Sequence, residues 1–375
     1  MEGPRPLKPE EFESLITLIN TVFAHHVGRM KESFPLLFSH HNWPNLFVFS
    51  DKGRIVSHVG MRLDEILVLG CRIKVASIGS VATYEEYRGK SLATQCLQAA
   101  EAKAVTEGAS VTLISGRRGL YDRFGAVRVG RSRVYSFAPA AAPQGLLARE
   151  AASADIFKVE RIYECEPVRF HRPLEDWAAL FAAIEGRYVP DFRDAVYLIG
   201  PSSGPTAYVA CRFGRWDDKP FARVAEYAGN RQDVVAALPA VAAATGADAL
   251  EFSVPDYDVW LKSAATATGL SSRETYLMGH TVKISCLPTF VRSIKPYIEE
   301  RIGRSGAGGV AFQPGPGTTY DVIIGEEHIP FAVPSFTTLV FGSPETENLE
   351  GVGFGGGLLG RIFPMPLPLP GLNYV

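Results

Sequence analysis

The sequence has no cysteine pattern of the kind that binds zinc or builds a disulfide framework. Its cysteines are odd in number, scattered and without a Cys-x-x-Cys pair: Cys71, Cys96, Cys165, Cys211 and Cys286. The histidine pairs His25-His26 and His40-His41 also lack the spacing of metal ligands. We therefore expect no metal site and no disulfide scaffold, which fits a reducing cytoplasm.

Long apolar runs and an excess of charge are also missing. No run approaches the ~20 apolar residues of a membrane-spanning helix, and the start, MEGPRPLKPEEF, has no apolar core of a signal peptide. With 38 basic and 40 acidic residues, the formal net charge is −2, so there is no basic footprint for nucleic acid or an anionic membrane. We expect a soluble, cytoplasmic protein that binds neither.

A first α/β unit is predicted up to about Phe137. Apolar spacing in residues 10–24 indicates a helix, and the alternation that follows residue 45 indicates a hairpin and a further strand, RIKVASIGSVAT. The loop YRGKSLA then opens a helix that ends at Gly108. The strand SVTLIS, the Gly-rich GRRGLYDRFG and a last strand, VRVGRSRVYSF, complete the unit.

The order of elements then repeats after an Ala- and Pro-rich linker, residues 139–154. In the repeat, NRQDVV replaces RGKSLA at the joint between strand and helix, so no small residue stands where phosphates would sit. We interpret residues 155–282 as the same fold without a cofactor site. Residues 283–375 are long enough for a small third, α+β domain.

The loop YRGKSLA, residues 87–93, contains the Gly-Lys-Ser that ends a P-loop. A P-loop also needs a glycine five residues before the glycine of Gly-Lys-Ser, which is Gly89 here. Tyr84 stands at that position, so the loop is not an ATP-binding P-loop. The remaining alternatives are a solvated turn and a loop whose backbone N–H groups, at the positive end of a helix, hold the pyrophosphate of another cofactor.

The stretch SVATYEEYRGKSLAT resembles the acetyl-coenzyme A signature of GNAT-type N-acetyltransferases, Arg/Gln-x-x-Gly-x-Gly/Ala. Arg88, Ser91 and Ala93 fall on its positions, with Ser91 where the family usually has glycine. The resemblance implies that the cofactor's pantetheine arm pairs with backbone between two splayed strands. The residues it assigns to cofactor binding are Val81, Ala82, Thr83, Arg88, Gly89, Lys90, Ser91, Leu92, Ala93 and Thr94.

A second stretch, GRRGLYDRFGA, resembles a segment of the Eis-type (enhanced intracellular survival) acetyltransferases, with Tyr121, Arg123, Phe124 and Gly125 in matching positions. That resemblance implies an α/β (α+β) chain of two tandem GNAT folds with mixed, mostly antiparallel sheets, the second degenerate, and a domain like a sterol carrier protein. The domains are then residues 1–138, the catalytic GNAT domain; 139–154, the linker; 155–282, the degenerate GNAT domain; and 283–375, the C-terminal domain.

The chemistry requires an acid for the thiolate that leaves the thioester. Tyrosine, with a pKa of ~10, is protonated at neutral pH and suits this role, which the resemblance assigns to Tyr121. The alternative is a buried tyrosine that anchors a helix.

A base must take the proton from the amine, and RIKVASIGSVAT holds no Asp or Glu. The tail FPMPLPLPGLNYV alternates proline with apolar residues, a pattern that favours a stiff, buried path. By resemblance, the base is the α-carboxylate of Val375; the alternative is a polyproline ligand for a partner. Asp64 or Glu65 is a further candidate to face the acceptor.

The sequence thus predicts an acetyl-CoA-dependent N-acetyltransferase in which an amine attacks directly within a ternary complex. A non-catalytic acyl-CoA-binding or sensing module is the alternative, and a longer acyl donor is a third possibility. The resemblance implies a small-molecule or lysine-type amine as acceptor and a homo-oligomer, a hexamer in Eis-type proteins.

Overall fold

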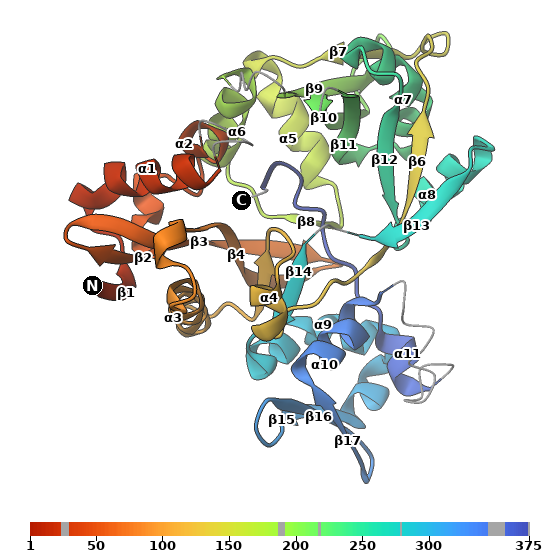
Figure 1. Ribbon diagram of the computed structural model, residues 1–375. Helices are drawn as coiled ribbons and strands as arrows, with labels where there is room; N and C mark the ends of the chain where they lie inside the picture. Colours follow the sequence, from red (N-terminus) through yellow and green to blue (C-terminus); the bar gives the residue numbers. More distant parts are fainter. Residues whose placement is uncertain (24–29, 187–191, 217–218, 278–279, 344–356, 374–375) are drawn as a thin grey trace.

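Two mixed sheets and a smaller third part make up the fold (Figure 1). The structure is a computed structural model that describes residues 1–23, 30–186, 192–216, 219–277, 280–343 and 357–373. Among these residues, no helix combines the length and the apolar character needed to cross a membrane. The two GNAT-like sheets confirm the predicted fold class of tandem GNAT folds.

The first sheet has the order β1-β2-β3-β4-β5-β14, and β8 also pairs with β3. All of its pairs are antiparallel except the parallel pair of β4 and β5. Its strands are β1 Glu2–Pro6, β2 Leu46–Asp51, β3 Arg54–Val68, β4 Cys71–Thr83, β5 Val111–Ile114, β8 Val168–Phe170 and β14 Thr281–Ile284.

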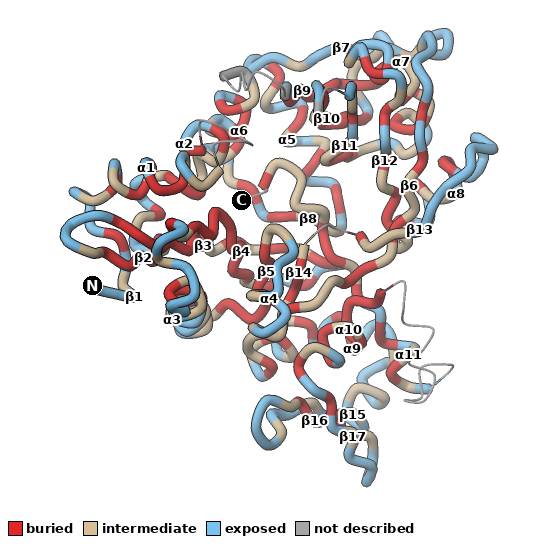
Figure 2. The backbone as a smooth tube through the Cα atoms, in the orientation of Figure 1, coloured by how far each residue is buried: buried red, intermediate tan, exposed pale blue. Residues whose placement is uncertain are grey.

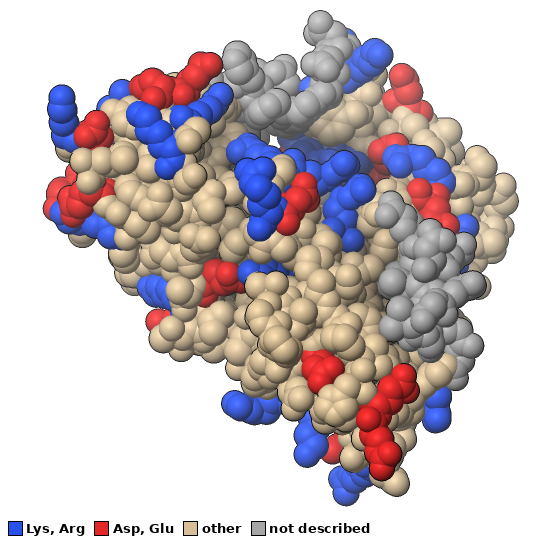
Figure 3. All heavy atoms as spheres, turned by 60° about the horizontal axis from the view of Figure 1, so that its bottom comes forward, with Lys and Arg blue, Asp and Glu red and all other residues tan. Residues whose placement is uncertain are grey.

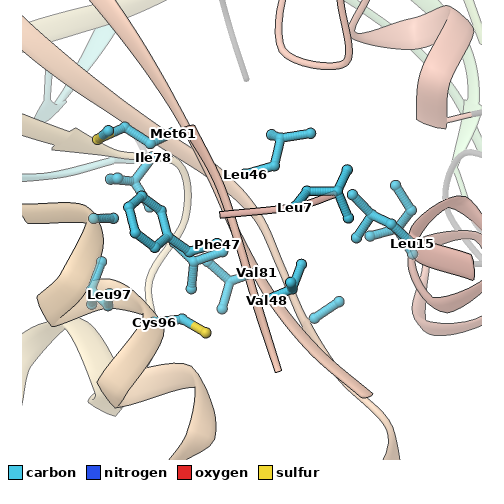
Figure 4. Packing of buried hydrophobic residues seen from close by; sticks show 14 of the residues in the cluster. Leu7, Leu15, Leu46, Phe47, Val48, Met61, Ile78, Val81, Cys96 and Leu97 are labelled. Atoms are coloured by element: carbon cyan, nitrogen blue, oxygen red, sulfur yellow. The ribbon is translucent and has the colours of Figure 1, made fainter. Parts of the chain in front are cut away.

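Helices cover both faces of this sheet. The main ones are α1 Phe12–Val22 and α3 Leu92–Thr106. Shorter helical segments are η1 Pro9–Glu11, α2 Met30–Ser33, η2 His40–Asn45, η3 Glu85–Tyr87 and α4 Gly119–Arg123. Figure 4 shows Cys96 and Leu97 of α3 beside Ile78 and Val81 of β4, and Leu15 of α1 on the other side. The central strands are therefore buried on both sides (Figure 2).

The second sheet has the order β13-β6-β12-β11-β10-β9-β7. Its strands are β6 Arg131–Phe137, β7 Leu147–Glu150, β9 Phe192–Gly200, β10 Ala207–Trp216, β11 Lys219–Gly229, β12 Leu250–Pro255 and β13 Ser272–Tyr276. Its helices are η4 Ser153–Asp155, α5 Ile156–Glu164, α6 Leu174–Gly186, α7 Arg231–Thr245 and α8 Val259–Ala267. The strand–helix order β11-α7-β12 repeats that of β4-α3-β5.

The two units exchange their last strands, which the sequence analysis missed. β6 was expected to complete the first sheet, but it pairs with β12 and β13 in the second. Conversely, β14 pairs with β5 in the first. The residues expected to form a featureless linker contain β7, which pairs with β9 at the edge of the second sheet. Periodicity predicts a strand but not its partner, and two similar units offer similar edges.

The third part packs a three-stranded sheet against helices. It comprises α9 Leu287–Gly308, β15 Val310–Pro314, β16 Thr319–Ile324, β17 Glu327–Ala332, α10 Val333–Phe341 and α11 Leu358–Ile362. The turn η6 Gly371–Asn373 lies further along the tail, beside β11 of the second sheet. From α11 the chain leaves this part and runs up between the two units (Figure 1). The likeness of this part to a sterol carrier protein stays a prediction.

Candidate active site

β4 and β5 part from one another where the sequence placed the cofactor. Their parallel pairing runs from Val75↔Val111 to Ile78↔Ile114, and the Ser115 N–H still donates to the Ile78 carbonyl at 2.9 Å. Beyond Ile78, β4 continues to Thr83 and, in the described part of the chain, pairs only with β3. Among the described residues, the backbone of residues 79–83 thus has no strand partner on the side of β5, where the two strands leave a gap.

A β-bulge bends β4 at this point. Gly60 lies opposite Gly79 and His58 opposite Ala82, so β4 has one residue more than β3 between these pairs. Ser80, in the bulge, has a positive φ of 54°, and its hydroxyl is buried without a hydrogen-bond partner among the described residues. Bulges commonly re-aim a strand next to a functional site.

The loop of residues 88–91 presents the open end of α3. Gly89 and Ser91 have positive φ angles of 78° and 58°, and the Ser91 side chain, at the N-cap, makes no capping hydrogen bond. Within the described residues, no acceptor is found for the N–H groups of residues 92–94, which open the helix. Free N–H groups at the positive end of a 15-residue helix can bind an anion.

The equivalent helix end in the second unit is closed. The Asn230 side chain accepts hydrogen bonds from the N–H groups of Gln232 and Asp233 at 3.0 and 3.1 Å. Just before it, the Glu166 carboxylate accepts from the Gly229 N–H at 2.7 Å and pairs with Arg231 at 2.6 Å. Side chains of this unit therefore occupy the donors that an anion would need.

Basic side chains flank the gap in the first unit. Arg88, Lys90, Arg117 and Arg118 are exposed, and none of them has an ion-pair partner among the residues described. Arg118 Nη1 donates to the Val81 carbonyl on the open edge of β4, at 3.3 Å. Sequence reasoning missed Arg117 and Arg118, although two arginines directly after a buried strand were a signal. Figure 3 shows that Lys and Arg gather locally on the face drawn there, despite a net charge near zero.

Tyr121 lies on the short helix α4, which follows β5 almost directly. Its N–H donates to the Arg118 carbonyl at 2.8 Å, and its own carbonyl accepts from the Ala126 N–H at 3.0 Å. The side chain is 2% exposed. The turn thus fixes Tyr121 at the end of β5 that faces the gap.

Of the two acidic candidates on β3, Asp64 is the buried one. It accepts from the Ser77 hydroxyl at 2.9 Å and pairs with Arg62 at 2.9 Å. Burial raises the pKa of Asp64, and the charge of Arg62 opposes that shift. Glu65 instead pairs with Arg72, which is exposed. Asp64 is therefore held by Ser77 of β4, one residue before Ile78, where the parallel pairing of β4 and β5 ends.

His58, also on β3, is a buried neutral histidine at the bulge. Its Nδ1 lies 3.1 Å from the Phe47 carbonyl, and since a carbonyl only accepts, Nδ1 carries the proton. Nε2 therefore keeps its lone pair and has no hydrogen-bond partner in the described chain. Burial lowers the pKa of His58 to about 3.

The C-terminal tail is buried, as its composition predicted. Phe363, Met365 and Leu367 are at most 2% exposed, and the Met365 N–H donates to the Val340 carbonyl at 2.7 Å. A tail packed in this way is not free to be a polyproline ligand. Val375, the predicted base, lies outside the described residues, which end at Asn373.

Comparison with known proteins agrees with this geometry. Residues 3–128 match a family described as "Acetyltransferase (GNAT) domain". No curated protein matches the sequence.

Several solved structures share the fold over nearly the whole chain. A GCN5-related N-acetyltransferase from Anabaena variabilis is 13% identical, with a TM-score of 0.65, covering 97% of this chain and 98% of its own. A probable N-acyltransferase from Enterococcus faecalis is 15% identical, with a TM-score of 0.66, and the match covers 97% of this chain and 96% of that one. Eis1 from Mycobacterium abscessus is 12% identical, with a TM-score of 0.60, and the match covers 97% of each chain. Residues 3–128 are thus similar to a GNAT acetyltransferase domain, and the chain shares the fold of these larger structures over nearly its whole length.

Proposed function

We propose that the protein is an acetyl-CoA-dependent N-acetyltransferase that transfers the acetyl group to an amine within a ternary complex. The observation that carries this proposal is the contrast between the two helix ends. The first turn of α3 has free N–H donors beside a gap in the sheet, whereas that of α7 is capped by Asn230.

Acetyl-CoA would lie in the gap between β4 and β5. Arg88, Gly89, Lys90 and Ser91, with the N–H groups of Leu92, Ala93 and Thr94, would hold the pyrophosphate. The pantetheine arm would pair with the open backbone of Val81, Ala82 and Thr83. Arg118 occupies the Val81 carbonyl in the free protein, so we expect it to move to the cofactor's phosphates.

The chemistry then needs two proton transfers. The amine nitrogen attacks the thioester carbonyl, the carbon–sulfur bond breaks, and Tyr121 donates its proton to the departing thiolate. The amine's own proton goes to the terminal carboxylate of Val375. A free α-carboxyl has a pKa of ~3.5, and burial would raise it toward that of a useful base.

The remaining parts have supporting roles in this proposal. Residues 155–282 bind no cofactor, because Asn230 takes the first N–H donors of α7 and Glu166 takes the N–H of Gly229 just before the helix. The acceptor is a small-molecule or lysine-type amine. No metal takes part, and assembly into a homo-oligomer is a further expectation from the resemblance.

A tag at either end of the chain tests the role of the terminal carboxylate. A short C-terminal extension converts the carboxylate to an amide, so turnover should fall by about 10²–10⁴-fold while acetyl-CoA affinity stays the same. The matched control is an N-terminal tag, since Met1 is exposed. This tag should change neither turnover nor acetyl-CoA affinity. Full turnover by the C-terminally tagged protein would remove Val375 from the mechanism and make Asp64 the next candidate.

A further inference from the structure

A buried arginine holds the end of the described tail. Arg172, which follows β8, donates to the Asn373 side-chain oxygen from Nε at 2.9 Å and from Nη2 at 2.6 Å. The same guanidinium donates to both carboxylate oxygens of Glu226 on β11, at 3.2 and 2.8 Å. All three residues are less than 5% exposed. We call this group the tail clamp.

Other contacts fix the tail clamp in place. The Tyr208 hydroxyl donates to Glu226 at 2.7 Å, and the backbone N–H of Leu372 donates to Glu226 at 3.0 Å. The Arg172 guanidinium also lies over the rings of Tyr163 and Trp177, 4.3 and 4.1 Å from their centroids. Every charge is therefore satisfied, and charge-assisted hydrogen bonds of this kind are stronger than neutral ones.

The tail runs along the gap in the second unit that corresponds to the cofactor gap in the first. β11 and β12 share one register pair in the described chain, Arg223↔Glu251. Residues 364–369 line a cavity of about 600 Å³ together with residues of β11, of the loop that follows β12 and of the start of α7. Gly371 passes so close that a Cβ there would lie 2.0 Å from Glu226 Oε2.

The clamp also reaches the first unit. The charge of Arg172 lowers the pKa of Asp64 on β3, although burial, Arg62, Ser77 and Asp176 have larger effects. Asp64 in turn accepts from Ser77, the neighbour of the residue where β4 and β5 part. Gly371 and Leu372 line a small cavity of about 40 Å³ with Phe34 of the first unit.

We propose that Arg172 and Glu226 are positioning residues, and that the second unit uses the gap between β11 and β12 as a dock for the C-terminal tail. Two residues follow Asn373, and two residues span at most ~7 Å. Fixing Asn373 therefore sets where the terminal carboxylate can stand. This inference rests on the proposed role of that carboxylate as the base.

Release of the terminal valine by a carboxypeptidase tests the dock itself. Each release rate is divided by the rate for the same chain unfolded in urea, so that sequence preference cancels. Asn373→Ala and Glu226→Gln should each speed release from the folded protein by about tenfold or more. Asp155→Asn is the matched control, since Asp155 also pairs with an arginine, Arg149, but does not line the cavity along the tail, and its rate should equal that of the wild type.

Thiol release from acetyl-CoA, with the same variants, tests positioning. Asn373→Ala should lower kcat by about 10²-fold, as misplacement of a catalytic group does, with unchanged acetyl-CoA affinity and with the fold retained by circular dichroism. The acid limb of its kcat–pH profile should move to lower pH, because a carboxylate released toward water returns to a pKa of ~3.5. A purely structural role would leave that limb in place.

The outcomes separate the two proposals. If a C-terminal tag stops turnover but Asn373→Ala and Glu226→Gln retain wild-type kcat and release rates, the clamp is not a positioning device. If the tag is harmless while both variants speed valine release, the dock exists and the carboxylate is not the base. If Glu226→Gln fails to fold, Asn373→Ala alone decides whether the clamp positions the tail, because Asn373 lies only two residues before Val375.

Discussion

Thr112 and Ser285 share a hydrogen bond between their hydroxyls at 2.8 Å, although 173 positions separate them. They lie at the junction of β5 and β14, where the first sheet receives a strand from beyond the second unit. Conversely, β6 precedes the second unit in the chain but pairs with β12 in the second sheet. The boundary predicted at residue 138 therefore follows a strand that pairs in the other unit's sheet, and the boundary predicted at residue 282 falls within such a strand.

The first prediction is that a fragment of residues 1–138 does not fold alone. It lacks β14 and β8, so an edge of β5 is unpaired, and β6 is left without a sheet. We expect an insoluble or unfolded fragment by circular dichroism. Coexpressed with residues 139–375, it should become soluble and copurify. A lone fragment that is folded and binds acetyl-CoA would show that the exchanged strands are dispensable.

The second prediction concerns backbone strain in the cofactor loop. Ser91 has a φ of 58°, a conformation that costs a non-glycine residue about 1–2 kcal/mol. Part of that cost is offset by the greater freedom of glycine in the unfolded chain. Ser91→Gly should therefore raise the free energy of unfolding by about 0.5–1 kcal/mol, measured by urea denaturation.

Gly89→Ala is the matched comparison for Ser91→Gly. The φ of Gly89 is 78° and a Cβ there meets nothing within 4 Å, so only the backbone conformation is penalised. We expect a loss of about 1 kcal/mol. A less stable Ser91→Gly protein would mean that the serine hydroxyl makes a contact worth more than the strain.

The third prediction is a loss of stability in acid caused by His58. Its pKa is about 3 in the fold and ~6.5 when unfolded, so between these values the unfolded chain binds more protons. Stability is then full above pH ~6.5 and falls as the pH is lowered toward 3. From pH 7 to pH 5 the contribution amounts to about 2 kcal/mol.

His58→Asn isolates this contribution, because an amide N–H can still donate toward Phe47 but cannot gain a proton. The difference in unfolding free energy between pH 7 and pH 5 should be about 2 kcal/mol smaller in the variant than in the wild type. Equal differences in the two proteins would show that His58 does not titrate on unfolding in this range.

The fourth prediction separates binding from chemistry at Tyr121. Tyr121→Phe removes only the hydroxyl, so acetyl-CoA affinity should persist while turnover falls by about 10²–10⁴-fold. Tyr135→Phe, a change to a buried tyrosine of the second sheet, is the control and should leave turnover unchanged. Undiminished turnover in Tyr121→Phe would reduce that residue to an anchor of α4.

Local patterns predicted the elements well and their partners poorly. The loop after β4, the helix α3 and the turn that bears Tyr121 depend on neighbouring residues, and the sequence placed each of them. The strands that pair with β6 and with β14 lie far away in the chain, and the spacing of apolar residues does not identify them. The tail clamp was missed for the same reason, since Arg172, Glu226 and Asn373 come from three distant segments.

The central claim is that the first unit transfers an acetyl group from acetyl-CoA to an amine. The most direct test is thiol release from acetyl-CoA by the full-length protein with polyamines, lysine peptides and aminoglycosides, with the acetylated product identified by mass spectrometry. We predict thiol release that depends on an amine, with one acetylated amine formed per thiol. Tight binding of acetyl-CoA without release of thiol for any amine would contradict the claim and indicate a binding or sensing module.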